Sequence, residues 1–431
     1  MVYYPVGFGE EKAWYPAGLA ACVTWDAGCE PVPGRTGGLR YVFDFSWNSV
    51  NLFCDPPPGL PPGTVTWAEI DLEAIKVNIR SFCRWVGPRV QVIAVVKANA
   101  YGHGAVPVAR TALEAGASRL AVHRLLEGVE LRQAGIPAPI LVMGYVPPDG
   151  AEEVIRWGLT PTVTTPEVAQ ALSARAVAAG VVIPVHIKVD TGMGRFGLLP
   201  DEVVPFARAL SALPGLRMEG IFTHFCTADS ADPAYMRLQF RRFVDVLEGL
   251  SGAGISIPLR HACNSAATMR FPEAHLDAVR PGIAIYGLDP SSEWPPVFPL
   301  RPAMMLKSRV VRVRTIPPGW GIGYGRTFIP DRPMRVALLP VGYGDGYHRI
   351  LSNRGAVLLH GQRAPVLGRV SMDQIVVDVS HIPEVREEDV AVLFGRQGEA
   401  ELRVEEVAAW AETINYEVTT SILPRVARIY V

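Results

Sequence analysis

The chain has 431 residues, of which 49% are apolar and 19% are charged, and its formal net charge is -1. These values are typical of a globular protein and do not favour nucleic acid or an anionic membrane as a partner. The six cysteines form no CxxC pair and no grouping with zinc-finger spacing, so we expect reduced thiols, no metal site and a cytoplasmic protein. The sequence predicts neither a transmembrane helix nor a secretory signal.

Residues 1–62 differ from the rest of the chain in composition and periodicity. They are rich in aromatic residues, Gly and Pro, show no sustained periodicity, and lead into a proline-rich run at residues 56–63. Such a run is typical of a polyproline linker. We expect a loosely ordered extension of unknown role, and translation from a mis-chosen start codon would also explain it.

From residue 64 onward, strand and helix patterns alternate. After a strand at 64–71 and a helix at 72–86 with Asp71 as its N-cap, strands are predicted at 90–97, 119–123, 139–143, 160–164, 185–190, 218–224, 258–263 and 277–286. The clearest helices between them are predicted at 103–117, 125–135, 166–180, 201–212 and 234–253. Eight such units predict a (β/α)₈ barrel over residues 63–300, with a doubly wound sheet as the alternative.

Residues 301–431 are predicted to form a mainly-β domain. Short β-branched runs parted by Gly/Pro turns predict strands at 306–316, 334–341, 356–359, 375–379 and 390–394, with one helix at 403–413. The early strand at 64–71 precedes the first helix of the barrel, so it is also a candidate member of this β domain.

The apolar run 92–96 leads directly to Lys97. A run this short and apolar is typical of a strand buried on both faces, which places Lys97 at a carboxyl strand end, where barrels carry their chemistry. Only five of the 41 basic residues are lysines, and arginine cannot supply a neutral amine. Lys97 is therefore a candidate nucleophile toward a carbonyl, with a lysine that merely extends to solvent as the alternative.

Other polar residues lie near the carboxyl ends of the predicted barrel strands: Tyr101, Lys188, Asp190, Arg195, His224, Asn264, Ser265 and Arg280. Each alone could be a structural polar group, but strand ends of a barrel meet at one mouth, so we expect the set to converge there. Ser265 with the amides of Gly282 and Ile283 predicts a phosphate site after the last two strands. A neutral lysine and a phosphate site together predict pyridoxal 5′-phosphate (PLP) as the cofactor.

The stretch 95–104, VVKANAYGHG, closely resembles the PLP-lysine signature of the alanine racemase family. The resemblance runs from about Val65 to Val431, and the stretches 188–195, 323–325 and 372–374 also match the family. It implies a PLP-dependent isomerase with a barrel and a C-terminal β domain. It also implies a homodimer that interconverts L- and D-alanine and supplies D-alanine for peptidoglycan.

The resemblance implies a role for each site residue. Lys97 would hold PLP as an aldimine and act as one base, and Tyr324 of the partner subunit would be the other, since racemisation needs a base on each face of a planar carbanion. His224 would assist Tyr324, and Arg280, braced by Asn264, would face the pyridine nitrogen and leave it unprotonated. The implied phosphate ligands are Tyr101, Ser265, Gly282, Ile283 and Tyr416.

The resemblance also implies the substrate side of the site. Arg195 would contact the phenolic oxygen of the cofactor and the carboxylate of the substrate, and a carbamylated Lys188 would orient Arg195. The alternative for Lys188 is an ordinary lysine that faces Asp190. Substrate-side residues from the other subunit would be Met372, Asp373 and Tyr343.

Other functions stay open on the sequence alone. A related racemase with serine or broader specificity differs only in small pocket changes. A non-enzymatic PLP-binding carrier on the same barrel would lack the β domain. A decarboxylase on a barrel of this type would need neither a second base nor a carbamylated lysine.

Overall fold

The structure, a computed structural model, describes residues 59–431. The extension predicted for residues 1–62 therefore lies almost entirely outside the described residues. None of the helices within residues 59–431 is both long enough and apolar enough to cross a membrane.

Eight parallel strands close into a barrel in chain order. They are β2 (Gln91–Val95), β3 (Arg119–Val122), β4 (Ile140–Val142), β5 (Thr160–Val163), β6 (Ile183–Lys188), β7 (Leu216–Phe222), β8 (Leu259–His261) and β9 (Ala278–Val279). Most of their residues are buried, as expected for strands covered on both faces. The predicted barrel is confirmed, and the doubly wound alternative is excluded.

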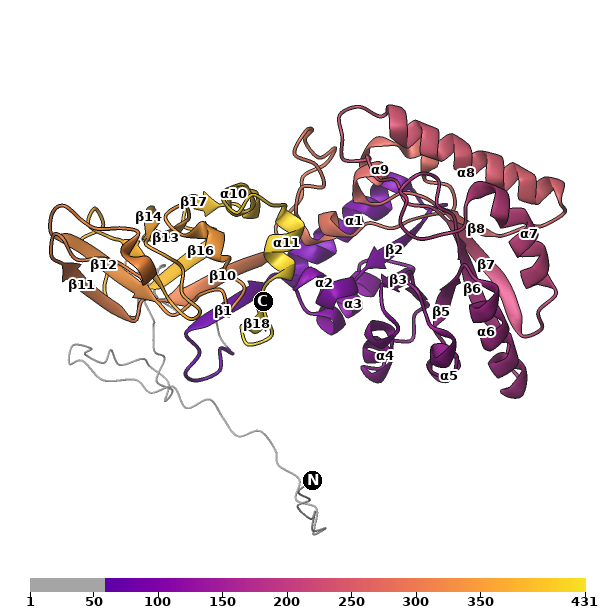
Figure 1. Cartoon of the computed structure of the whole chain (residues 1–431), viewed down its shortest axis with the longest axis horizontal. Coiled ribbons are helices and arrows are strands. Elements are labelled where there is room, and N and C mark those ends of the chain that lie inside the picture. The colour runs from indigo at the N-terminus through magenta and orange to yellow at the C-terminus, as the bar shows by residue number, and fades with distance from the viewer. Residues whose placement is uncertain (1–58) are drawn as a thin grey trace, which may run out of the picture. The chain divides into compact units, whose positions relative to one another are not determined.

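Helices follow the strands and lie outside them (Figure 1). They are α1 (Leu72–Val86), α3 (Ala105–Glu114), α4 (Leu125–Gln133), α5 (Ala151–Arg156), α6 (Pro166–Ala178), α7 (Pro200–Ser211), α8 (Ala234–Gly252) and α9 (Ser265–Arg270). The side chain of Asp71 accepts a hydrogen bond from the Ala74 amide at 2.8 Å, so it caps α1 as predicted. The sequence prediction missed α5 and α9, each only six residues long.

The predicted strand at 277–286 is wrong beyond Val279. Pro281 has no N–H to donate to a ladder, and the backbone at Gly282 leaves the extended region. Residues Ile283–Tyr286 instead form the 3₁₀ helix η3. Arg280 therefore follows β9 rather than lying within it.

The remaining strands form a second sheet of ten members. They are β1 (Thr66–Ile70), β10 (Met304–Arg309), β11 (Arg312–Ile316), β12 (Met334–Leu339), β13 (Ala356–Leu359), β14 (Gln362–Leu367), β15 (Ile375–Asp378), β16 (Val390–Gln397), β17 (Ala400–Leu402) and β18 (Ala427–Tyr430). The early strand β1 lies in this sheet, antiparallel to β10 and parallel to β18. The mainly-β domain that follows the barrel is confirmed.

Some details of the β domain differ from the sequence prediction. The single strand predicted at 306–316 is two strands, because β10 pairs with β1 and β16 whereas β11 pairs with β12. The helix predicted at 403–413 is α10 (Val404–Trp410). A second helix, α11 (Asn415–Thr420), and the strands β14, β17 and β18 were not predicted.

Lys97 begins a turn with left-handed backbone. Strand β2 ends at Val95, and in the short helical turn α2 (Lys97–Tyr101) the four residues 98–101 have φ of 52° or 53°. This conformation costs an L-residue about 1–2 kcal/mol, so contacts from elsewhere must hold it. The lysine turn, residues 97–101, is thus a feature that strand and helix periodicity could not predict.

Two side chains hold the lysine turn from opposite ends. Glu127 in α4 accepts a hydrogen bond from the amide of Ala98 at 2.6 Å. His103 places Nδ1 at 3.1 Å from the carbonyl oxygens of Ala100 and Tyr101. Because a carbonyl only accepts, Nδ1 of His103 carries the proton.

The β domain packs against the end of this turn at Gly102. The φ of Gly102 is +87°, and a Cβ there would collide with the carbonyl oxygen of Thr419 in α11. The carbonyl oxygen of Gly102 accepts a hydrogen bond from Arg428 Nε in β18 at 3.1 Å. A glycine is therefore required by both the backbone conformation and the close approach of α11.

Gly102→Ala is expected to destabilise the protein by roughly 2–5 kcal/mol, because a left-handed alanine costs about 1–2 kcal/mol and the steric overlap about 1–3 kcal/mol more. The matched control is Gly135→Ala, since Gly135 has a φ of +77° with no atom near the added Cβ; it should cost only roughly 1–2 kcal/mol. Urea unfolding followed by circular dichroism measures both losses. Equal losses would show that α11 does not press on the turn.

Candidate active site

A cavity of about 160 Å³ lies at the carboxyl ends of the barrel strands. Its walls are Val95, Lys97, Tyr101, Met143, His224, Asn264, Ser265, Arg280, Gly282, Ile283 and Tyr416. All nine residues predicted to bind a cofactor are among them, and only Val95 and Met143 were not singled out from the sequence. The structure therefore brings together residues that lie more than 300 positions apart in the chain.

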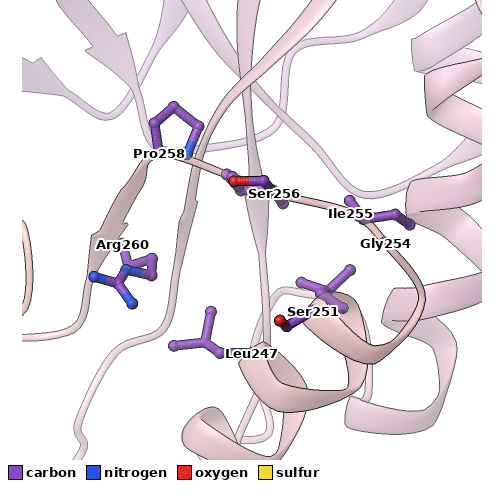
Figure 2. A pocket seen from close by; sticks show the side chains of 9 residues that line it. Leu247, Ser251, Gly254, Ile255, Ser256, Pro258 and Arg260 are labelled. Atoms are coloured by element: carbon purple, nitrogen blue, oxygen red, sulfur yellow. The ribbon is translucent and has the colours of Figure 1, made fainter.

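A larger hollow of about 520 Å³ lies elsewhere, between the end of α8 and the start of β8. Figure 2 shows Leu247, Ser251 and Ile255 on one side of it and Pro258 and Arg260 on the other. The guanidinium of Arg260 is already paired with Asp277 at 2.6 Å. This hollow lies at the amino end of β8, whereas barrels carry their chemistry at the carboxyl ends, so we do not take it for the active site.

Lys97 presents a partly buried amine to the smaller cavity. Burial lowers the pKa of Lys97, the charge of Arg195 lowers it further, and Glu127 partly opposes the shift. A lowered pKa increases the fraction of neutral amine, which is the form that attacks a carbonyl. The local chemistry is therefore suited to covalent attachment of an aldehyde.

Hydroxyl and amide groups gather in another part of the cavity. The hydroxyl of Ser265 accepts a hydrogen bond from the Gly282 amide at 2.8 Å. Burial raises the pKa of the Tyr101 phenol and of the Tyr416 phenol, so both stay protonated and can donate. A Cβ at Gly282 would collide with the Tyr101 hydroxyl. These neutral donors fit a phosphate group, which accepts hydrogen bonds at all its oxygens.

Arg280 is buried, with 3% of its surface exposed. Its NH1 group donates to His261 Nδ1 at 2.7 Å. Its NH2 group donates to the carbonyl oxygens of Thr223 at 2.7 Å and Ala262 at 3.0 Å. Three of the five N–H donors of the guanidinium are thus fixed by protein acceptors, which sets its orientation in the cavity wall.

The prediction that Asn264 braces Arg280 is wrong. Asn264 is the N-cap of α9, and its Oδ1 accepts from the Ala267 amide at 3.0 Å. Its Nδ2 donates to the carbonyl oxygen of Phe225 at 3.3 Å. Both ends of the amide are therefore occupied by capping and by the neighbouring loop.

The loop after β6 is organised by one carboxylate. Asp190 accepts hydrogen bonds from the backbone amides of residues 192–194 through Oδ1 and from the Arg195 amide, at 2.8 Å, through Oδ2. Burial alone would raise the pKa of Asp190, but these four donors outweigh it and lower the pKa. Asp190 therefore serves the loop that carries Arg195, and it is not simply a counter-ion for Lys188.

Lys188, at the end of β6, is buried among aromatic rings and positive charges. Its Nζ lies 5.0 Å from the ring centroid of Phe196 and 5.6 Å from that of Phe222. Burial, followed by the charges of Arg195 and Arg280, lowers the pKa of Lys188 to about 8. Roughly a tenth of the amine is therefore neutral at pH 7, far more than for an ordinary lysine.

His224 lies in the cavity wall as a neutral imidazole. Burial holds its pKa well below the usual value, and the charges of Arg280, Arg195 and both site lysines lower it further. A neutral imidazole can both donate and accept a hydrogen bond. His224 can therefore connect a donor and an acceptor at the cavity mouth.

Six of the predicted site residues do not line this cavity: Lys188 and Arg195 of the barrel, and four residues of the β domain. Tyr324 lies in the 3₁₀ helix η4 (Tyr324–Arg326) of the β domain with 71% of its surface exposed. Met372 and Tyr343 are also exposed, at 52% and 41%. Asp373 lies beside Met372 and pairs with Arg425 at 2.8 Å. The structure therefore leaves these four residues on the surface of the β domain.

Two contributors to the site were missed from the sequence. Glu127 supports the lysine turn, and its only signal was a carboxylate early in a helix that follows a barrel strand. His261 fixes Arg280, and its signal was a polar residue within a barrel strand. Neither signal is specific without the three-dimensional arrangement.

Comparison with known proteins agrees with this geometry. The family model described as "Alanine racemase, N-terminal domain" matches residues 70–290, and the one described as "Alanine racemase, C-terminal domain" matches residues 303–430. A curated alanine racemase from Desulforamulus reducens is 52% identical over 367 residues, which is 85% of this chain and 98% of that protein.

Solved structures extend the likeness to the fold. A Bacillus anthracis alanine racemase with bound L-Ala-P has a TM-score of 0.82 at 40% identity, covering 86% of this chain and 96% of the other. A Bartonella henselae alanine racemase with covalently bound pyridoxal phosphate has a TM-score of 0.77 at 30% identity, covering 85% and 100%. On its sequence, its barrel and its β domain, this chain belongs to the alanine racemase family.

Proposed function

We propose that this protein is a PLP-dependent alanine racemase that interconverts L- and D-alanine with two bases and supplies D-alanine for peptidoglycan. One observation carries the proposal: the amine of Lys97, whose pKa is lowered, lines the same cavity as hydroxyl and amide groups suited to bind a phosphate. PLP, when bound, supplies an electron sink that acidifies the Cα–H of an amine attached to it.

Different residues of the cavity would bind different parts of the cofactor. Lys97 would hold the cofactor covalently and, once the amine of the substrate has taken its place, its free amine would take and return the proton at Cα on one face of the substrate. Arg280 would face the pyridine nitrogen with its remaining N–H donors, and because arginine keeps its proton, that nitrogen would stay unprotonated. The phosphate would be held by Tyr101, Ser265, Gly282, Ile283 and Tyr416, which all line the cavity.

The second base is Tyr324 of a partner subunit in a homodimer. Its exposure and its absence from the walls of the cavity of its own chain support this assignment, because a base must reach the opposite face of Cα. His224 assists this tyrosine at the mouth. Tyr343, Met372 and Asp373 line the substrate side from the same β domain.

Lys188 is carbamylated by carbon dioxide in this proposal. The reaction requires a neutral amine, and burial among cations favours that form. The amine nitrogen bonds to the carbon of carbon dioxide and releases one proton to water, so the product is an anion near Arg195 and Arg280 that relieves the excess of positive charge. It also orients Arg195 toward the carboxylate of the substrate.

The proposal includes a cytoplasmic location. Cys83, Cys226 and Cys263, the cysteines that the structure describes, are free thiols. Free thiols are typical of a reducing compartment.

The purified protein with added PLP is expected to absorb in the visible range and to convert L-alanine to D-alanine. A racemisation assay with alanine, serine, lysine and arginine measures the specificity, and alanine should be turned over fastest. Lys97→Ala should lose both the absorption band and the activity, because no other lysine lines the cavity. Covalent PLP binding by Lys97→Ala would refute the proposal.

Mixing two inactive variants is expected to restore activity if the site is shared. In a mixed dimer of Lys97→Ala and Tyr324→Phe, one site carries both changes and the other carries neither. Random exchange of subunits makes about half of the dimers mixed, so activity should return to roughly a quarter of the wild-type value. Each variant mixed with itself is the control, and no recovery in the mixture would show that Tyr324 serves the site of its own chain.

Carbamylation of Lys188 is expected to give a carbamate signal in ¹³C NMR after exchange with ¹³C-bicarbonate. The signal should be absent from Lys188→Arg. It should persist in the matched control Lys307→Arg, because Lys307 lies in the β domain and is paired with Glu69 at 2.7 Å. As the pH falls below the pKa of about 8, the neutral amine disappears and carbamate formation should weaken.

A further inference from the structure

A chain of buried polar groups runs from Arg280 into the core of the barrel. Arg280 contacts His261 Nδ1 at 2.7 Å, and His261 Nε2 lies 2.9 Å from His186 Nδ1. His186 Nε2 lies 3.3 Å from the carboxylate of Glu219, which Arg119 binds at 2.8 Å. The three members Arg280, His261 and His186 are at most 3% exposed. Strands β3, β6, β7 and β8 each contribute one residue to this chain.

The positions of the protons on the two histidines follow from Arg280, the first group of this hydrogen-bonded series. A guanidinium only donates, so His261 Nδ1 must accept and the proton of His261 must lie on Nε2. That N–H donates to His186 Nδ1, so the proton of His186 also lies on Nε2. It then donates to the carboxylate of Glu219, which only accepts. Both imidazoles are neutral, and each hydrogen bond has one donor and one acceptor.

The surroundings are shaped to hold these two imidazoles. His261 stacks on Phe222, with ring centroids 4.9 Å apart and planes at 5°. A Cβ at Gly220 would collide with the ring of His186, so a glycine makes room for it in β7. Burial lowers the pKa of His186 and of His261, in agreement with neutral rings.

The chain ends on a carboxylate that remains charged. The hydrogen bond from His186 lowers the pKa of Glu219 to about 2, with burial opposing and Arg119 assisting. Glu219 therefore stays an anion at every pH at which the protein would work. It is the acceptor that keeps the proton of His186 on Nε2.

We propose that His261, His186 and Glu219 form a positioning relay for Arg280, in which the carboxylate fixes both histidine tautomers so that an acceptor always faces the guanidinium. The inference rests on the proposed function, in which Arg280 faces the pyridine nitrogen. If the tautomer of His261 reversed, an N–H would face a cation that only donates, and Arg280 would turn away from its place. None of the three relay residues lines the cavity, so they act through Arg280.

Substitutions at His261 separate the relay from simple packing. The carboxamide of His261→Gln can present an acceptor to Arg280 and a donor to His186, whereas His261→Leu can present neither. We expect kcat for alanine to fall roughly 10- to 100-fold in His261→Leu with little change in KM, the size expected for loss of a hydrogen bond to a charged group. His261→Gln should stay within about threefold of wild type. Equal impairment of two folded variants would overturn the relay.

The tautomers are read directly on the holoenzyme by ¹⁵N NMR of ring-labelled histidines. We expect protonated Nε2 and unprotonated Nδ1 for both relay histidines, assigned by their loss in His261→Gln and His186→Gln. Glu219→Gln should introduce a second tautomer of His186, because a carboxamide can donate as well as accept. The matched control is Arg217→Gln, an exposed arginine 3.5 Å from the same carboxylate, which should leave the spectrum unchanged.

Either of two NMR results would contradict the relay: a proton on Nδ1 of His261, or a single unchanged tautomer in Glu219→Gln. This readout does not depend on turnover. A wild-type protein that does not racemise alanine would refute the proposed function while leaving the tautomer result to stand or fall separately.

Discussion

Four positively charged side chains, two of them buried, gather at the mouth of the barrel. Lys97, Lys188, Arg195 and Arg280 all lower the pKa of His224, and Arg195 also lowers the pKa of both lysines. Burial weakens the solvation of Lys97, Lys188 and Arg280, whereas Arg195 is exposed. Such a cluster is tolerable only if some members give up their protons or if anions are supplied. Both lysines respond by a lowered pKa, His224 stays neutral, and only the arginines must remain charged.

Each arginine at the mouth is stabilised by an indirect route. Arg195 belongs to a loop whose amides are gathered by Asp190, so the carboxylate organises the backbone around the charge. Arg280 is connected to the carboxylate of Glu219 only through the neutral imidazoles of His261 and His186. A direct ion pair with a carboxylate would occupy the N–H donors of Arg195 or Arg280. Those donors would then not be available to a bound anion or to a ring nitrogen. The indirect contacts keep the guanidinium groups oriented and their remaining donors available.

The sequence predicted much of this arrangement and missed the parts that depend on tertiary contacts. Apolar runs and helical periodicity located the barrel strands because burial on both faces leaves a strong local signal. The position of Ser265 just after a strand followed from that register, whereas Arg280 was placed inside a strand that in fact ends at Val279. The left-handed lysine turn could not be predicted, since residues 98–101 are ordinary L-residues held by distant groups. The bracing of Arg280 was assigned to Asn264 rather than His261, because hydrogen-bond partners depend on side-chain directions that spacing does not reveal.

The contact between Arg428 and Gly102 joins residues 326 positions apart. During synthesis the barrel strands leave the ribosome long before β18 does. The lysine turn must therefore wait for the last strand of the second sheet before its final support is in place. Pairing at such a long sequence separation is slow because much loop entropy is lost first. The reactive amine thus gains its fixed geometry at a late step of maturation, after both sheets have assembled.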